Sequence, residues 1–108
     1  MPRSIIVSRH PASIQWLRSQ LAQVDLQLAH LDTAMLQPGD CVYGNLTIHL
    51  VAALNARGAR YFHLQIDLPP ELRGVELDDT QLAALEPTLT EIRADVVPGV
   101  SPHVRADL

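Results

Sequence analysis

Short apolar segments typical of strands alternate with helical apolar stripes along this chain, and that alternation constrains the fold more than any other feature. Apolar residues that recur every three or four positions predict helices, and short β-branched runs bounded by turn residues predict strands. The predicted strands are residues 4–8, 26–31, 41–43 and 60–66. The predicted helices are residues 11–23, residues 45–56 and a last helical stretch over 78–92. Strands that alternate with helices favour a mostly parallel sheet with helices on both faces.

The last predicted helix rests on an apolar stripe with spacings of three, four and three residues, formed by Leu82, Leu85, Leu89 and Ile92. We expect Asp78 or Asp79 to cap this helix and Pro87 to kink or restart it. Because crossovers between parallel strands are right-handed, the predicted fold is α/β with a parallel four-stranded sheet in the order 2-1-3-4. With 108 residues the chain has the size of one domain, which we expect over 1–97 with a flexible tail at 98–108.

Composition excludes several classes of protein. No apolar run approaches the roughly 20 residues that cross a bilayer, so we expect no membrane association. The formal net charge of −4 argues against a basic protein that binds long nucleic acid. The single cysteine, Cys41, cannot form an internal disulfide, and we expect a reducing, cytoplasmic setting. The chain has no lysine, so cationic chemistry must use arginine or protonated histidine.

Two loops at adjacent strand ends are the predicted ligand site. Ligands of open α/β sheets bind beyond the carboxyl ends of the strands, where the strand order reverses. In the predicted order that point lies between the first and third strands. The residues that follow these strands are Ser8, Arg9 and His10 on one side and Gly44, Asn45, Leu46 and Thr47 on the other.

These loops carry groups that suit a phosphodiester. Arg9 is a fixed cation with a planar fork of donors, and both loops precede helix N-termini, which favour anions. Gly44 allows close approach of a ligand to the backbone. The plainer alternative is that Ser8 only caps a helix, Arg9 is solvated and His10 is an ordinary loop residue.

Other candidate groups carry weaker signals. A metal site could be imagined at His10, His30, His49 and Asp32, but no spacing matches a zinc motif and we expect no metal or other cofactor. His63 is expected to be a hydrogen-bonded core residue, and Cys41 a small core residue. The acidic side chains are expected to form a solvated face, and they are Glu71, Glu76, Asp78 and Asp79.

An ordered set of short motifs then resembles a known family. The set comprises Val7-Ser8-Arg9-His10-Pro11, His30-Leu31-Asp32, Pro38-Gly39-Asp40, Gly58-Ala59-Arg60-Tyr61, His63-Leu64, Pro69, Arg73-Gly74 and Glu76-Leu77. Over about residues 4–77 it is similar to the small Csx-sixteen family of type III CRISPR-associated proteins. The resemblance implies a CARF-like, Rossmann-like domain that acts as a homodimer and as a ring nuclease, which opens cyclic tetra-adenylate and ends an antiviral signal.

The resemblance also implies a metal-independent mechanism, in which a ribose 2′-hydroxyl attacks the adjacent phosphorus. The products are then linear species with a 2′,3′-cyclic phosphate. Arg9 would neutralise the developing charge, and His10 would act as general acid or base. Phosphate and ribose would be bound by Ser8, Gly44, Asn45, Leu46 and Thr47.

Three rival functions stay open. The chain could bind a cyclic oligoadenylate without cutting it, as a sponge or sensor. It could instead be a regulatory partner of another CRISPR-associated protein, or a metal-dependent hydrolase that uses its histidines. Turnover at substrate excess separates a ring nuclease from a sponge or sensor. A regulatory partner should bind no cyclic nucleotide, and a metal-dependent hydrolase should lose its activity in a chelator.

Overall fold

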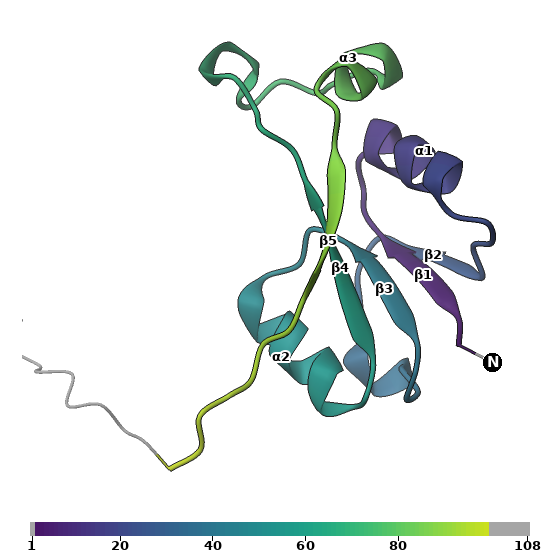
Figure 1. The fold of residues 1–108 in the computed structure, drawn as a ribbon, viewed down its shortest axis with the longest axis vertical. Helices are drawn as coiled ribbons and strands as arrows, with labels where there is room; N and C mark the ends of the chain where they lie inside the picture. The colour runs from purple at the N-terminus through teal and green to yellow at the C-terminus, as the bar shows by residue number, and fades with distance from the viewer. Residues whose placement is uncertain (1, 100–108) are drawn as a thin grey trace, which may run out of the picture.

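The computed structural model describes residues 2–99, which form a sheet with helices on both faces (Figure 1). The elements in chain order are β1 (Ser4–Val7), α1 (Pro11–Gln20), β2 (Leu26–Leu28), η1 (Thr33–Met35), β3 (Cys41–Gly44), α2 (Ile48–Ala56), β4 (Arg60–Gln65), η2 (Pro70–Leu72), α3 (Asp79–Ala84) and β5 (Thr88–Ile92). Among these residues no helix is long and apolar enough to cross a bilayer. The predicted tail at 98–108 falls almost wholly outside the described residues.

The sheet has five strands in the order β2-β1-β3-β4-β5, and it is mixed. The pairs β1–β2, β1–β3 and β3–β4 are parallel, whereas β5 runs antiparallel to β4. The prediction of an entirely parallel four-stranded sheet is therefore wrong, and the order differs from 2-1-3-4 by the strand added beside β4. Val7 pairs with Gly44 and Gly44 with His63, so the carboxyl ends of β1, β3 and β4 lie in register.

The added strand comes from the second half of the predicted 78–92 helix. Asp78 caps α3 as predicted, since its carboxylate accepts from the backbone N–H of Gln81. The helix ends at Ala84, because Glu86 has φ +52 and Pro87 has no N–H to donate to a further turn. Beyond them the β-branched residues Thr88, Thr90 and Ile92 recur at every second position, which is the period of a strand.

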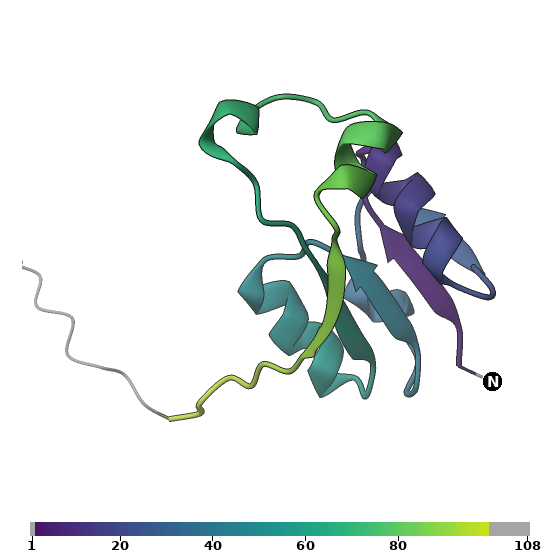
Figure 2. The same ribbon diagram turned by 45° about the horizontal axis from the view of Figure 1, so that its top comes forward.

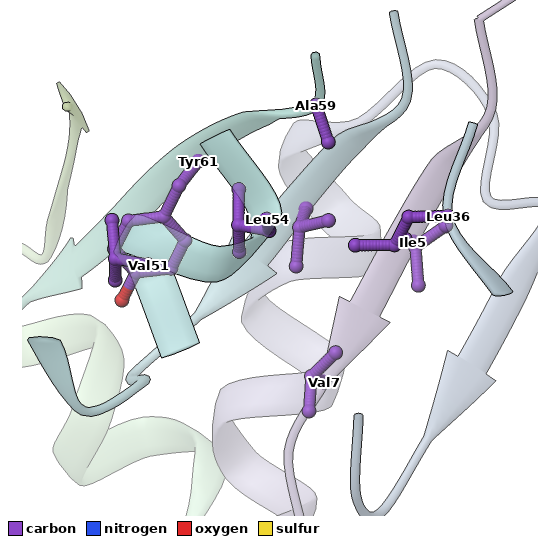
Figure 3. Close-up of a cluster of buried hydrophobic side chains, with 8 residues drawn as sticks. Ile5, Val7, Leu36, Val51, Leu54, Ala59 and Tyr61 are labelled. Atoms are coloured by element: carbon purple, nitrogen blue, oxygen red, sulfur yellow. The ribbon is translucent and has the colours of Figure 1, made fainter. Parts of the chain in front are cut away.

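Each face of the sheet has its own core cluster. On one face α2 packs Val51 and Leu54 against Ile5, Val42 and Tyr61 (Figure 3). On the other face Leu17 of α1 packs against Ile6 and Leu64. Helices thus cover both faces, as predicted, and the strands that carry the predicted site are fixed from both sides.

At the amino end of the sheet a buried carboxylate ties the chain together. Asp40 is 1% exposed, and it accepts from Arg3 Nη2 at 2.7 Å and from the backbone N–H of Gln37 at 2.8 Å. The hydrogen bond from the Arg3 guanidinium lowers the pKa of Asp40 below its usual range. This pair lies far from the carboxyl strand ends, so we assign it to stability.

Candidate functional site

The two predicted loops line one cleft beyond the carboxyl ends of β1 and β3. Its volume is about 490 Å³, and it is lined by Val7, Ser8, Arg9, His10, Ala29, His30, Leu31, Asn45, Leu46, Thr47 and Leu50. All the predicted site residues are among these except Gly44. His30 joins them from the end of β2, although the sequence had offered it only as a metal ligand.

Gly44 lies behind the cleft and has a packing reason to be glycine. A Cβ at this position would overlap the carbonyl oxygen of Val7 on the neighbouring strand β1. The missing side chain therefore lets β1 and β3 approach at the point where both strands end. Its direct contact with a ligand stays a prediction.

Three hydrogen bonds fix the loop after β3 against β4. The hydroxyl of Tyr61 accepts from the backbone N–H of Leu46 at 2.9 Å and lies 3.0 Å from the carbonyl oxygen of Gly44. The side-chain amide of Asn45 donates to the carbonyl of Leu64 at 2.6 Å. Because burial raises the pKa of Tyr61, its ring stays a neutral phenol that can donate and accept. The cleft wall is thereby held by the sheet itself.

His63 completes this network. Its Nδ1 lies 2.7 Å from the Tyr61 hydroxyl. A phenol donates one hydrogen bond, and all contacts of Tyr61 are satisfied together when it donates to Gly44 while His63 Nδ1–H donates to it. His63 is therefore hydrogen-bonded, as predicted, and it supports the cleft wall, but it is half-buried and not a core residue.

The N-terminus of α2 opens toward the cleft without a side-chain cap. Thr47 is the N-cap residue, yet its hydroxyl lies 3.2 Å from His49 Nδ1 and makes no capping hydrogen bond. The first amide groups of α2 therefore keep their capacity to bind an anion. Arg9 is exposed at the same cleft and forms no ion pair with a carboxylate of the described residues. A free cation and free amides at one cleft suit a phosphate.

Ser8 and His10 organise the turn between β1 and α1. The hydroxyl of Ser8 accepts from the backbone N–H of His10 at 3.1 Å, and no side chain caps α1. The alternative that Ser8 serves only as a helix cap is therefore wrong. The His10 side chain is 65% exposed, and its Nδ1 lies 3.6 Å from a carboxylate oxygen of Glu76.

A second cavity adjoins the cleft at His10 and Asn45. Its volume is about 350 Å³, and it lies between the start of α1 and the segment that follows β4. Figure 2 shows this segment arching over the carboxyl end of the sheet to reach α3. The lining is mostly apolar and comprises His10, Ala12, Ser13, Asn45, Ile66, Leu68, Gly74, Val75, Glu76, Leu77 and Leu82. Sequence reasoning missed this cavity, because residues 66–77 have no periodic pattern.

The remaining candidates lie apart from one another. In the described part of the chain no three histidine, cysteine or acidic side chains gather closely enough to hold a metal ion. Cys41 is half-buried at the start of β3, with its Sγ 3.7 Å from the carbonyl of Gly39. The predicted acidic face is exposed, although Asp78 serves as a cap and Glu76 faces His10.

Comparison with known proteins yields one family. Residues 5–95 match the profile of the family described as "Putative CRISPR-associated protein (Cas_VVA1548)". No curated protein and no solved structure matches the chain. The matched residues contain both loops of the cleft and all of the five-stranded sheet except Ser4, the first residue of β1.

Proposed function

The chain belongs to the Cas_VVA1548 family of CRISPR-associated proteins, and on this premise we propose that it is a ring nuclease for cyclic tetra-adenylate of the Csx-sixteen kind. The observation that carries the proposal is the cleft that joins Arg9, His10 and the uncapped N-terminus of α2. A guanidinium and free amides bind a phosphodiester, and an imidazole can transfer protons at neutral pH. The resemblance of the sequence motifs to the Csx-sixteen family is the reason for choosing a cyclic oligoadenylate as the substrate.

The proposed reaction needs no nucleophile from the protein. The ribose 2′-oxygen forms a bond to the adjacent phosphorus while the bond from phosphorus to the 5′-oxygen breaks. The 2′-hydroxyl loses its proton to a base, and the 5′-oxygen gains one. The products are a 2′,3′-cyclic phosphate and a 5′-hydroxyl. Alignment of the attacking oxygen and stabilisation of the extra negative charge lower the barrier.

Arg9 and His10 take the two roles in this reaction. Arg9 has no carboxylate partner among the described residues, so its charge is available to the phosphorane. His10 is exposed at the mouth of the cleft and can exchange the proton with the reacting oxygens. Ser8, Asn45, Leu46 and Thr47 position the phosphate and the ribose.

A homodimer would present two such clefts to one cyclic ligand. Cyclic tetra-adenylate has approximate rotational symmetry, which a two-fold dimer can match. Ile48 supports this arrangement, since it begins α2 beside the cleft and is 78% exposed. Sedimentation of the purified protein, with and without the nucleotide, measures the dimer directly.

The decisive test is turnover in a chelator. The protein is mixed with a large molar excess of cyclic tetra-adenylate in EDTA, and the products are resolved by chromatography. We expect complete conversion to linear products with a 2′,3′-cyclic phosphate. Arg9→Ala and His10→Ala should each lower the rate by about 10²–10⁴-fold, and Arg9→Ala should also weaken binding.

Arg18→Ala is the matched control for the loss of a cation. Arg18 lies on α1 and donates to Gln27 Oε1 at 2.7 Å, away from the cleft, so its loss should leave turnover unchanged. If the nucleotide is bound tightly but stays intact, cleavage is refuted and the protein is a non-catalytic binder of cyclic oligoadenylate. Intact nucleotide without binding would refute both functions.

A further inference from the structure

The apolar cavity beside the cleft contains a buried polar group that the fold does not use. Ser13 is 8% exposed and lines this cavity from the first turn of α1. The Ser13 hydroxyl forms no hydrogen bond with any of residues 2–99. Its oxygen is not fully buried, and Ser13 lines the cavity. Buried polar groups normally have partners. The Ser13 hydroxyl is therefore available to a group that enters the cavity.

The cavity also adjoins the proposed phosphate site. His10 and Asn45 line both spaces, so a molecule that occupies both would contact these two residues. On the cleft side the lining includes the polar side chains of Arg9 and Thr47. On the far side Leu77 and Leu82 make an apolar wall. A nucleotide has this same division, with a charged phosphate one ribose away from a flat, mostly apolar base.

We propose that the cavity under residues 66–77 is a purine-base subsite, which receives the adenine of the nucleotide whose phosphate lies in the strand-end cleft. This inference rests on the proposed function for its choice of ligand. The volume of about 350 Å³ lies at the lower end of the ~300–1,000 Å³ range of ligand pockets, which suits one base and excludes a whole tetranucleotide.

The polar groups of the cavity suit a purine base. The carboxylate of Glu76 can accept from an exocyclic amino group, and the Ser13 hydroxyl can donate to a ring nitrogen. Glu76 and Ser13 therefore supply an acceptor and a donor for the adenine of the proposed ligand.

The base contact can be measured without the cyclic ligand. AMP and ribose 5-phosphate share a phosphate and a ribose and differ only in the base. In amide NMR titrations both should shift Arg9 and Thr47 in the cleft, and AMP alone should also shift Ser13, Val75 and Leu77. We expect AMP to bind at least about tenfold more tightly. Equal affinities, with no shifts in the cavity from AMP, would overturn the proposal.

A substitution that fills the cavity provides the second test. Val75 lines the cavity and is 49% exposed, so Val75→Trp can fill it without disturbing the core. The variant should reduce AMP affinity to that of ribose 5-phosphate and leave ribose 5-phosphate binding unchanged. Val97→Trp is the control, since Val97 is 70% exposed and does not line the cavity. Unchanged AMP affinity in a folded Val75→Trp would refute the subsite.

Removal of the buried hydroxyl tests its role directly. Ser13→Ala should weaken AMP binding about 2- to 12-fold, as expected for the loss of one neutral hydrogen bond. The two proposals fail separately. If cyclic tetra-adenylate is neither bound nor cleaved but AMP shifts Ser13 and Leu77, the ring nuclease fails and the base subsite stands. If Val75→Trp cleaves cyclic tetra-adenylate with unchanged kcat and KM, the subsite fails and the nuclease stands.

Discussion

Replacing Tyr61 by phenylalanine removes one oxygen atom from the core and leaves the ring in its place. Tyr61 is 1% exposed, and its hydroxyl holds the loop after β3 through the N–H of Leu46 and the carbonyl of Gly44. The variant leaves both backbone groups without this partner, and it also removes the acceptor of the half-buried His63 Nδ1. At about 0.5–1.5 kcal/mol for each hydrogen bond, Tyr61→Phe should lower the free energy of unfolding by about 2 kcal/mol.

Urea unfolding followed by circular dichroism measures this loss. With a urea m-value of about 1–3 kcal/mol/M, the midpoint should fall by about 1 M. In a thermal scan the Tm should fall by roughly 10 °C, because about 1 kcal/mol shifts the Tm of a domain of this size by about 4–8 °C.

Tyr43→Phe is the matched control. Tyr43 lies half-buried on β3, where its ring stacks on Phe62 at 4.9 Å between centroids, and phenylalanine preserves that stacking. We expect its free energy of unfolding to stay within about 0.5 kcal/mol of the wild-type value. If Tyr61→Phe loses no more stability than Tyr43→Phe, the Tyr61 hydroxyl does not hold the loop and the reasoning is refuted.

Three further predictions concern the fold. Asp40→Asn should lower the free energy of unfolding by about 3 kcal/mol at neutral pH, because it breaks a buried ion pair. Since the pKa of Asp40 is lowered in the folded protein, its contribution is complete above the unfolded pKa of about 3.8 and is lost as the pH falls through the folded pKa. The wild-type and variant unfolding curves should therefore converge below pH 4, and a constant difference would contradict this. Gly44→Ala should lower the free energy of unfolding, measured in urea, by about 2 kcal/mol, because the new Cβ overlaps Val7. Gly74 has open space around it and φ +77, so Gly74→Ala should lower it by about 1 kcal/mol through backbone strain alone. Equal losses in the two variants would refute the packing argument for Gly44.

The sequence predicts the first four strands because their signals are local and agree with their tertiary environment. Short apolar runs form the strands, Gly58 ends α2, and Asp78 caps α3. The prediction fails where two signals conflict. Leu82 and Leu89 share a helical spacing, yet Leu82 is buried on the helix α3, whereas Leu89 packs from the strand β5 against the core cluster on the α1 face. The conformation of Glu86, which no pattern reveals, separates them.

The cleft is predictable for a topological reason. Parallel strands that adjoin bring their carboxyl ends together, so Ser8, Arg9 and Thr47 must meet wherever β1 lies beside β3. The second cavity is not predictable in the same way. Its walls include Ser13, which reads as an ordinary helix residue, and Val75, which belongs to an irregular segment. Only the path of the chain after β4 brings them together.

The antiparallel pairing of β5 with β4 makes the segment over the site a closed loop. Gln65 and Thr88 are register partners, so the sheet brings the two ends of residues 66–87 together. The entropy of closing such a loop grows only with the logarithm of its length, and each doubling costs about 0.6 kcal/mol. Residues can therefore be inserted or deleted in the irregular part of this loop, residues 66–77, at small cost to the stability of the sheet. The wall of the second cavity can thus be remodelled while the cleft beneath it is kept.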